Sequence, residues 1–253
     1  MHPILFKIGK ITIYTYGTIL YIDLILSTFL LNKFAPKFNL DKEKVFYSLL
    51  IVLFFMYLGG KIGYYAFNEV QNSFANFIIK VINPFESGLT VLGAIVFSFV
   101  GLYISSKLFK LSLINLSDLF TFIAPLSISI GRIGCLFAGC CYGKESAWGI
   151  FLHGAVRYPT QIMESILTFL LFLYFLIELK KGNYYKGKYM INFLFFYGLI
   201  RFFVEFFRES KMAFLFFTWA QVFSFFLIIF SIILHNIIKP RENKIAKEVR
   251  ENK

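Results

Sequence analysis

The 253-residue sequence has few charged residues and no long polar stretch that would form a soluble domain. Only 16% of it is charged, whereas 58% is hydrophobic, 21% is aromatic and the mean hydropathy is +0.70. A soluble domain of this size has too little interior to bury so much apolar surface. The composition therefore predicts a chain solvated by lipid. The sequence contains no low-complexity segments and no clear internal repeats.

Cysteine is almost absent, with three residues that all lie between Cys135 and Cys141. This excludes a disulfide framework. The three thiols could bind a metal together with His153, or be reactive beside arginine, but they lack the Cys-x-x-Cys spacing of a metal site. We interpret them as small buried residues that pack against glycine-rich helices, and His153 as a loop residue. We predict no metal and no cofactor.

Acidic residues are also scarce, at 14 against 26 basic residues, which gives a formal net charge of +12. The basic residues lie between apolar runs and in the tail, as in membrane proteins whose cytoplasmic loops face anionic headgroups. We therefore expect the membrane as a partner and no nucleic acid. Met1–Lys10 is short and no small-residue cleavage site follows the next apolar run, so we expect no signal peptide.

The apolar runs predict an all-α polytopic membrane protein with seven transmembrane helices, each near the ~20 residues that cross a bilayer. The predicted spans are Ile11–Leu31, Val45–Phe67, Leu89–Ser106, Leu116–Phe137, Ile162–Leu179, Tyr189–Phe207 and Ala213–Ile238. Pro125 and four glycines fall in or just after the fourth span, which favours a broken or re-entrant end there. Asn72–Val81 is a short apolar stretch suited to the membrane interface.

Lysine is concentrated in alternate loops and in the tail, which predicts an N-terminus outside and a C-terminus in the cytoplasm. The lysine-rich loops are 32–44, 107–115 and 180–188. We divide the chain into a single seven-span membrane domain, 1–238, and a charged, frayed cytoplasmic tail, 239–253.

Charged residues inside the apolar runs mark the candidate site. Helical spacing places Tyr197, Arg201, Glu205 and Arg208 on one face of a span. Two further segments with charged residues lie around Arg132 and from Arg157 to Glu164. Charges at membrane depth normally face a bundle interior, and guanidinium groups suit an anionic ligand. The alternative is a structural Arg–Glu pair that only locks helices together.

Several segments resemble one known family. They are His2 to Gly17, Gly59-Gly-Lys-Ile-Gly-Tyr-Tyr65, Gly131-Arg-Ile-Gly134, Arg157-Tyr-Pro-Thr-Gln-Ile-Met-Glu164, Arg201-Phe-Phe-Val-Glu-Phe-Phe-Arg208 and Trp219-Ala-Gln-Val-Phe-Ser224. In this order and spacing they resemble the prolipoprotein diacylglyceryl transferases of bacterial inner membranes. The resemblance covers Pro3 to about Ser224.

Two departures from the family pattern bear on mechanism. Leu92, in Ser87-Gly-Leu-Thr-Val-Leu-Gly-Ala94, stands where the family has a functional histidine, so proton transfer at this position is excluded. The signature continues as Cys135-Leu-Phe-Ala-Gly-Cys140, without the family's two asparagines and its acid. We interpret the chain as a diverged branch whose reaction is altered or whose base comes from elsewhere.

The resemblance implies transfer of the diacylglyceryl group of phosphatidylglycerol onto the lipobox cysteine thiol of prolipoproteins. This is the first step of lipoprotein maturation, in the bacterial cytoplasmic (inner) membrane, and glycerol phosphate leaves. A departing phosphate needs fixed positive charge. We predict that Arg132 and Arg201 supply it, that Glu205 orients Arg201, and that Tyr16, Glu164 or the arginines' own potential activates the thiol. Tyr16 could equally be an interfacial aromatic.

The remaining predicted contacts are with the two substrates. The predicted substrate-binding residues are Arg157, Gln161, Glu164, Arg208, Lys61 and Tyr197. Two other functions stay open: a lipid transferase with a different acceptor, and a non-catalytic lipid- or anion-binding membrane protein such as a transporter. Transfer of a labelled diacylglyceryl group to a lipobox peptide would separate them.

Overall fold

The computed structural model describes residues 3–9, 11–68, 74–83, 88, 90–182, 184–210, 212–214 and 217–251. The chain divides into two compact units. One consists of Met1–Leu30 and Asp118–Lys253, and the other of Leu31–Ser117. Helices α1 (Thr15–Phe34) and α5 (Leu113–Ala138) each have residues in both units.

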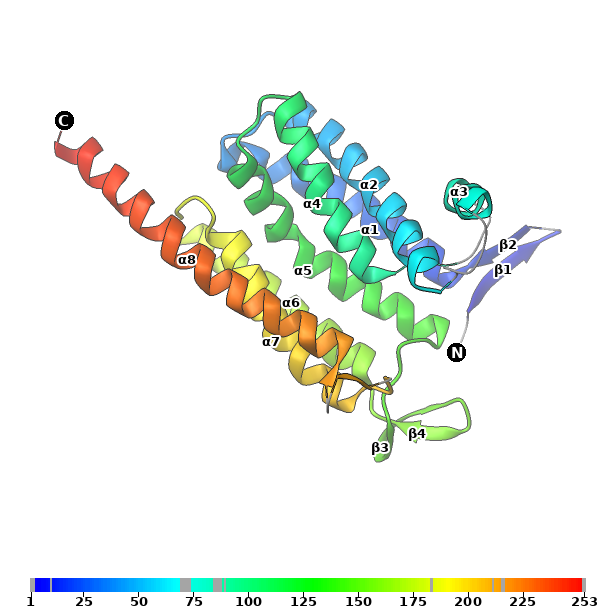
Figure 1. The fold of residues 1–253 in the computed structure, drawn as a ribbon. Helices are drawn as coiled ribbons and strands as arrows, with labels where there is room; N and C mark the ends of the chain where they lie inside the picture. The colour runs from blue at the N-terminus through cyan, green and yellow to red at the C-terminus, as the bar shows by residue number, and fades with distance from the viewer. Residues whose placement is uncertain are drawn as a thin grey trace. The chain divides into compact units, whose positions relative to one another are not determined.

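Unit 31–117 is built on two helices that pack through glycine. Its elements are the 3-10 helix η1 (Ala35–Phe38), α2 (Lys42–Asn68), α3 (Phe74–Ile82) and α4 (Val91–Leu108). Gly59 of α2 and Gly93 of α4 meet so closely that a Cβ on either would overlap the other's carbonyl oxygen. Small residues allow helix backbones in membranes to approach in this way. Figure 1 shows α2 and α4 side by side.

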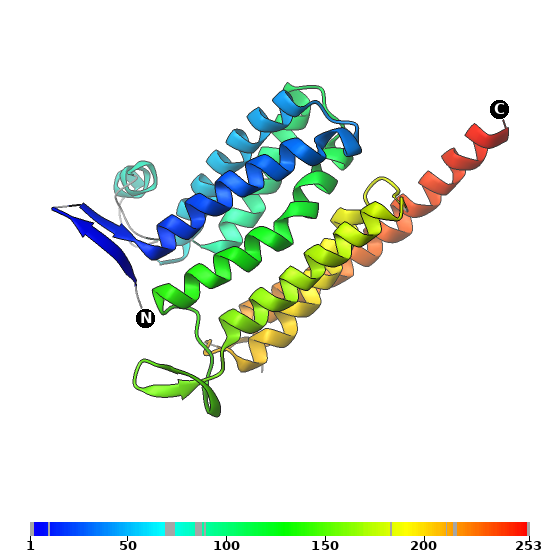
Figure 2. The same ribbon diagram turned by 180° about the vertical axis from the view of Figure 1, so that it is seen from behind.

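The other unit contains most of α1 and α5, three further long helices and three short hairpins. The three further helices are α6 (Thr160–Lys180), α7 (Lys188–Phe207) and α8 (Trp219–Glu251). The antiparallel hairpins are β1 (Ile4–Ile8) with β2 (Ile11–Tyr14), β3 (Glu145–Leu152) with β4 (Ala155–Arg157), and β5 (Met212–Phe214) with β6 (Phe217–Thr218). Helix α7 packs against both α6 and α8, as both views show (Figure 1 and Figure 2).

Edge-to-face rings fill the space among α5, α6 and α7. The ring centroid of Phe122 lies 5.9 Å from that of Phe172 and 5.2 Å from that of Tyr189. Phe175 lies 5.3 Å from Tyr189, and both side chains are fully buried. Such pairs add to the stability that area burial gives, and they fix the helices that carry the candidate site.

The predicted helical, polytopic architecture is confirmed in outline. In the described part of the chain, six helices are long and apolar enough to cross a membrane: Thr15–Phe38, Lys42–Ala66, Leu113–Ala138, Thr160–Lys180, Lys188–Phe207 and Trp219–Pro240. The predicted span Leu89–Ser106 corresponds to α4, whose described apolar stretch, Gly93–Leu108, is shorter than the others. The predicted interfacial stretch Asn72–Val81 overlaps the short helix α3, although residues 72 and 73 lie outside the described residues.

Four sequence predictions about helix limits are wrong. Residues 11–14 form a strand because they pair with β1, so the first helix begins at Thr15. The last helix begins only at Trp219 because the residues before it form a hairpin, in which Met212–Phe214 (β5) pairs with Phe217–Thr218 (β6). The fourth span is not broken, since α5 runs through Pro125 to Ala138. The tail continues α8 as far as Glu251 instead of fraying at its start.

Asp118 anchors the start of α7 from a distance. Its Oδ2 accepts hydrogen bonds from the amide of Gly187 at 2.6 Å and the hydroxyl of Tyr184 at 3.0 Å, and its Oδ1 accepts one from the amide of Met190 at 2.9 Å. The Asp118 side chain is fully buried. It therefore caps a helix whose N-cap residue is Gly187, which has no side chain to do so.

Replacing Asp118 by alanine is expected to lower the free energy of unfolding by about 2–3 kcal/mol, because buried donors lose their acceptor. Asp118→Asn keeps an acceptor oxygen and should cost less. Asp41→Ala is the matched control, since this exposed acid accepts one bond, from the amide of Lys44 at 3.0 Å. Denaturant unfolding of the detergent-purified variants measures both. Equal losses for Asp118→Ala and Asp41→Ala would contradict the anchoring role.

Candidate active site

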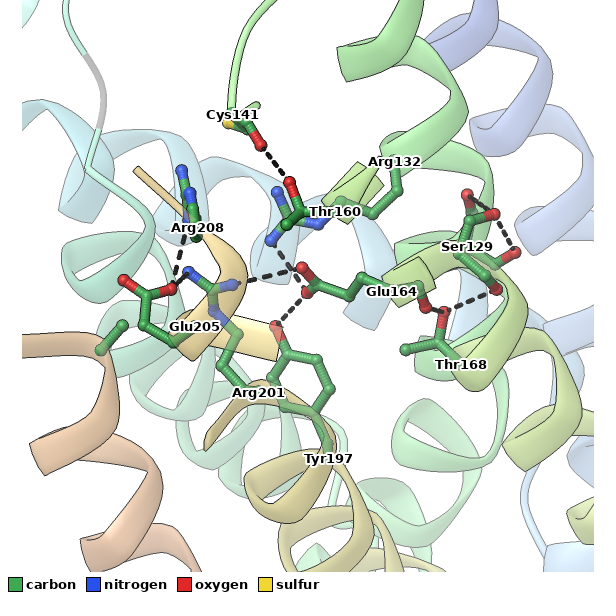
Figure 3. A network of polar contacts seen from close by, with 12 residues as sticks. Ser129, Arg132, Cys141, Thr160, Glu164, Thr168, Tyr197, Arg201, Glu205 and Arg208 are labelled. Atoms are coloured by element: carbon green, nitrogen blue, oxygen red, sulfur yellow. Dashed lines mark hydrogen bonds and ion pairs between the residues drawn. The ribbon is translucent and has the colours of Figure 1, made fainter. Parts of the chain in front are cut away.

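The Glu164 carboxylate joins two arginines from different helices (Figure 3). Arg132 Nη2 of α5 donates to Glu164 Oε1 at 2.9 Å, and Arg201 Nη1 of α7 donates to Oε2 at 3.3 Å. The Tyr197 hydroxyl donates to Oε1 at 3.4 Å. Glu164 is buried on α6. The structure thus brings Arg132, Glu164, Tyr197 and Arg201 together, as the sequence predicted for the two arginines.

The charged face of α7 extends this network by two turns. Arg201 Nη2 lies 2.8 Å from Glu205 Oε2, and Arg208 Nη1 lies 3.8 Å from the same oxygen. The Thr218 hydroxyl donates to Glu205 Oε1 at 3.1 Å. The predicted shared face of Tyr197, Arg201, Glu205 and Arg208 is therefore confirmed. Arg201 is placed between two carboxylates, one on its own helix and one on α6.

The network carries an excess of positive charge. Three guanidinium groups, of Arg132, Arg201 and Arg208, face two carboxylates, of Glu164 and Glu205. The arginine side chains are 14%, 12% and 22% exposed, whereas those of Glu164 and Glu205 are only 3% and 2% exposed. The carboxylates are thus enclosed, while the arginines keep accessible surface. Such a group suits an anion, and above all a phosphate.

A turn after α5 gathers the three cysteines. The Cys140 amide donates to the Cys135 carbonyl at 3.1 Å, and Gly139 and Cys141 have positive φ angles of 71° and 62°. The three sulfur atoms lie within 4.8 Å of one another. The sequence predicted small buried packing residues, but only Cys135 is buried and Cys140 is exposed. Regular spacing did not reveal the cluster because the left-handed turn creates it.

The first residues of α6 hold this turn. Thr160 Oγ1 donates to the Cys141 carbonyl at 3.0 Å, and Gln161 Nε2 donates to the Cys140 carbonyl at 2.7 Å. Both side chains are buried. Gln161 thus positions the turn, and its predicted substrate contact stays a prediction.

The neighbouring thiols, together with Arg208 and Arg132, lower the pKa of the Cys141 thiol below its ordinary value.

Arg157 serves a different cluster. Its guanidinium pairs with Glu209 and with Glu145, the latter at 3.3 Å, and Nε donates to the Leu152 carbonyl at 3.2 Å. It also lies 4.7 Å from the centroid of the Tyr142 ring. These protein groups enclose the side chain, so Arg157 holds the β3–β4 hairpin. Its predicted role in substrate binding has no support from this geometry.

Three other predicted or considered residues make contacts of their own. The Tyr16 ring packs on Gly134, where an added Cβ would lie 2.9 Å from Tyr16 Cδ2. His153 Nε2 lies 2.8 Å from the Gly139 carbonyl oxygen, so the His153 side chain contacts the backbone of the turn that carries the cysteines. Lys61 belongs to unit 31–117, where it is buried and donates to the Asn83 carbonyl at 3.2 Å. The roles predicted for Tyr16 and Lys61 stay predictions.

Two predictions fall partly outside the described residues. The segment 87–94 includes undescribed residues 87 and 89, and of Leu92 only the helical backbone at the start of α4 is described. Sequence reasoning also missed Thr218 as a partner of Glu205. A threonine directly before a helix is a common capping signal, but it did not indicate contact with a carboxylate on α7.

The chain is similar to known proteins over nearly its whole length. A model of the family described as prolipoprotein diacylglyceryl transferase matches residues 3–237. A phosphatidylglycerol–prolipoprotein diacylglyceryl transferase 2 from Clostridium perfringens (strain 13 / Type A) is 33% identical, over 96% of this chain and 98% of the relative. Phosphatidylglycerol–prolipoprotein diacylglyceryl transferases from Clostridium tetani and Ehrlichia ruminantium (strain Gardel) are each 28% identical, over 96% and 95% of this chain and 100% and 98% of the relatives.

Proposed function

Because the chain belongs to the prolipoprotein diacylglyceryl transferase family, we propose that it transfers the diacylglyceryl group of phosphatidylglycerol to the lipobox cysteine thiol of prolipoproteins. The single observation that supports this most is the pairing of Arg132 and Arg201 on one enclosed carboxylate. Two fixed guanidinium groups at one point of a membrane helix bundle suit a phosphodiester headgroup.

The reaction makes one carbon–sulfur bond and breaks one carbon–oxygen bond. The acceptor thiolate attacks the glyceryl carbon that carries the phosphate, and glycerol phosphate leaves with the bonding electrons. Negative charge then collects on the departing phosphate oxygen. Arg132 and Arg201 stabilise this charge, since preorganised donors in a site sheltered from water act strongly on a transition state. No cofactor has to supply electrons.

The two carboxylates fix the arginines in place. Glu164 holds Arg132 at 2.9 Å on Oε1 and Arg201 Nη1 at 3.3 Å on Oε2, and Glu205 holds Arg201 Nη2 at 2.8 Å. An oriented guanidinium loses less conformational entropy when the substrate binds. Arg208, the most exposed of the three arginines, is suited to the headgroup glycerol phosphate at the entrance of the site.

Transfer in a defined system tests this function. The purified protein in phosphatidylglycerol vesicles should move a labelled diacylglyceryl group to a lipobox peptide that contains cysteine. It should leave unmodified the same peptide with serine in place of that cysteine (the serine peptide). Transfer to neither peptide, together with saturable phosphatidylglycerol binding, would refute the transferase activity and leave a lipid-binding role. Transfer to a different thiol alone would show a changed acceptor, which the replacement of the family histidine by Leu92 allows.

We further propose a seven-span topology in the bacterial cytoplasmic membrane, with α4 as the third span, the N-terminus outside and the C-terminus inside. The support is the lysine content of alternate loops. Reporter fusions at Lys110 and Lys181 should read cytoplasmic, and one at Lys144 should read external. The site, which lies near the Lys144 end of α5 and α6, would then open to the outer leaflet. A reversed pattern would overturn both the orientation and the placement of the site.

A further inference from the structure

The three thiols are placed as ligands of a single ion would be. Their sulfur atoms lie within 4.8 Å of one another. In a tetrahedral site with zinc–sulfur bonds of about 2.3 Å, the sulfurs lie about 3.8 Å apart. Small rotations of the cysteine side chains would therefore bring all three onto one ion.

The backbone that carries the thiols is fixed by buried groups. Thr160 and Gln161 hold the carbonyls of Cys141 and Cys140 at 3.0 and 2.7 Å. Cys141 adopts a φ of 62°, in the left-handed region that non-glycine residues rarely occupy. Such a conformation persists only where the surroundings enforce it, and it is concentrated at functional sites. Packing alone requires neither this turn nor the convergence of three sulfur atoms.

In the described part of the chain, the cluster offers three ligands and no fourth, because no His, Asp or Glu side chain joins the three sulfurs. The nearby His153 contacts the Gly139 carbonyl instead. Structural zinc sites are closed by four protein ligands, whereas catalytic sites have three and keep one position for a substrate or water.

We propose that Cys135, Cys140 and Cys141 bind one thiophilic ion of the Zn²⁺ class through three thiolates, and that its fourth position receives the acceptor thiol. The second half of this proposal rests on the proposed function. It amends the sequence prediction of no metal, which depended on spacing and not on the geometry of the turn.

The three cysteines lie beside the arginine network, where an ion that binds the acceptor thiol would have to be. Cys135 lies one helical turn after Arg132 on α5, and Thr160 and Gln161 lie one turn before Glu164 on α6. Figure 3 shows Cys141 joined to Thr160 in the same group of residues as Arg132, Glu164 and Arg208. Three thiolates and a divalent ion carry a net charge of minus one, which the excess positive charge of the arginines offsets.

The step that this site supports conserves atoms and charge. The acceptor thiol binds the ion as a thiolate and releases its proton to water, because metals bind thiols in the deprotonated form. The sulfur then attacks the glyceryl carbon, the carbon–oxygen bond breaks, and glycerol phosphate leaves with the electron pair. The product thioether is neutral and a weaker ligand, so it departs. Zn²⁺ has no redox role. This activation replaces the base that is missing at Leu92.

Cobalt substitution of the full-length protein tests the binding half. Reduced, metal-free protein titrated with Co²⁺ should bind one ion per chain and show thiolate charge-transfer and tetrahedral d–d bands. Each variant, Cys135→Ser, Cys140→Ser or Cys141→Ser, should weaken binding at least about tenfold. Ala138→Ser is the matched control, because it adds a hydroxyl to the same turn without removing a thiol, and it should bind as the wild type does. No stoichiometric binding, or a protein purified without oxygen that contains a disulfide, would overturn the site.

Peptide addition tests the fourth position. A lipobox peptide with cysteine should shift the d–d bands, and the serine peptide should not. Removal of zinc with a chelator should lower transfer about 10²–10⁴-fold, as loss of a base does, and added zinc should restore it. Chelation of the wild type keeps this test valid if a serine variant fails to fold.

The outcomes separate the two proposals. Wild-type transfer rates in the metal-free protein would overturn metal activation and leave the transferase function standing. Ion binding by a wild type that transfers nothing to any thiol would refute the transferase function, and activation of the acceptor with it, while the three-thiolate site remains.

Discussion

Arg201→Ala is expected to lower the rate of diacylglyceryl transfer by about 10²–10³-fold, the usual cost of losing a preorganised electrostatic donor. Among the described residues, Arg201 is the one guanidinium that contacts both Glu164 and Glu205, so its loss removes positive charge from the centre of the network. Glu164 keeps Arg132, and Glu205 keeps Arg208. The fold should therefore survive, and the loss should appear in the rate.

Two variants of the same helix make this result specific. Arg201→Lys keeps the charge but not the planar fork, and we expect an intermediate rate. Phe203→Ala changes a side chain that is 59% exposed and should retain the wild-type rate. Transfer is measured with a lipobox peptide after size-exclusion chromatography confirms folding. An Arg201→Ala variant as active as Phe203→Ala would show that the ion pairs only lock the helices.

Glu164→Ala is expected to destabilise the protein by about 3–5 kcal/mol, the cost of removing one partner from a buried ion pair. The variant leaves Arg132 without this carboxylate, Arg201 with Glu205 alone, and the Tyr197 hydroxyl without its acceptor. Glu164→Gln keeps an acceptor oxygen and should lie between the alanine variant and the wild type.

Glu145→Ala is the matched control for this loss. Glu145 also pairs with an arginine, Arg157, but its own side chain is 71% exposed. Exposed pairs contribute about 0–1 kcal/mol, so the variant should unfold close to the wild type. Unfolding is followed by denaturant titration in detergent. Equal stability of Glu164→Ala and Glu145→Ala would contradict the central position of Glu164.

The sequence predicted the charged face of α7 because a helix repeats every 3.6 residues. Tyr197, Arg201, Glu205 and Arg208 must lie on one side of any helix that contains them. The meeting of Arg132 and Arg201 was predicted from the family resemblance together with the high cost of isolated charge in lipid. The structure confirms both, and adds Glu164 as the group that joins the two arginines. The opening of the site to the outer leaflet stays a prediction.

Other features depend on contacts that spacing does not encode. The apolar run Ile11–Tyr14 suits a strand as well as a helix, and pairing with β1 decides between them. The partners of Arg157 include Glu209, which lies far along the chain. The thiol cluster depends on a left-handed residue at Cys141, a conformation that sequence rarely predicts outside glycine.

A structure of the protein in lipid nanodiscs with bound phosphatidylglycerol tests the central claim most directly. The account predicts one phosphate whose oxygens lie about 3 Å from the guanidinium nitrogens of both Arg132 and Arg201, with Glu164 still between the two arginines. A phosphate bound at Arg157, or at only one of the two arginines, would contradict the shared clamp.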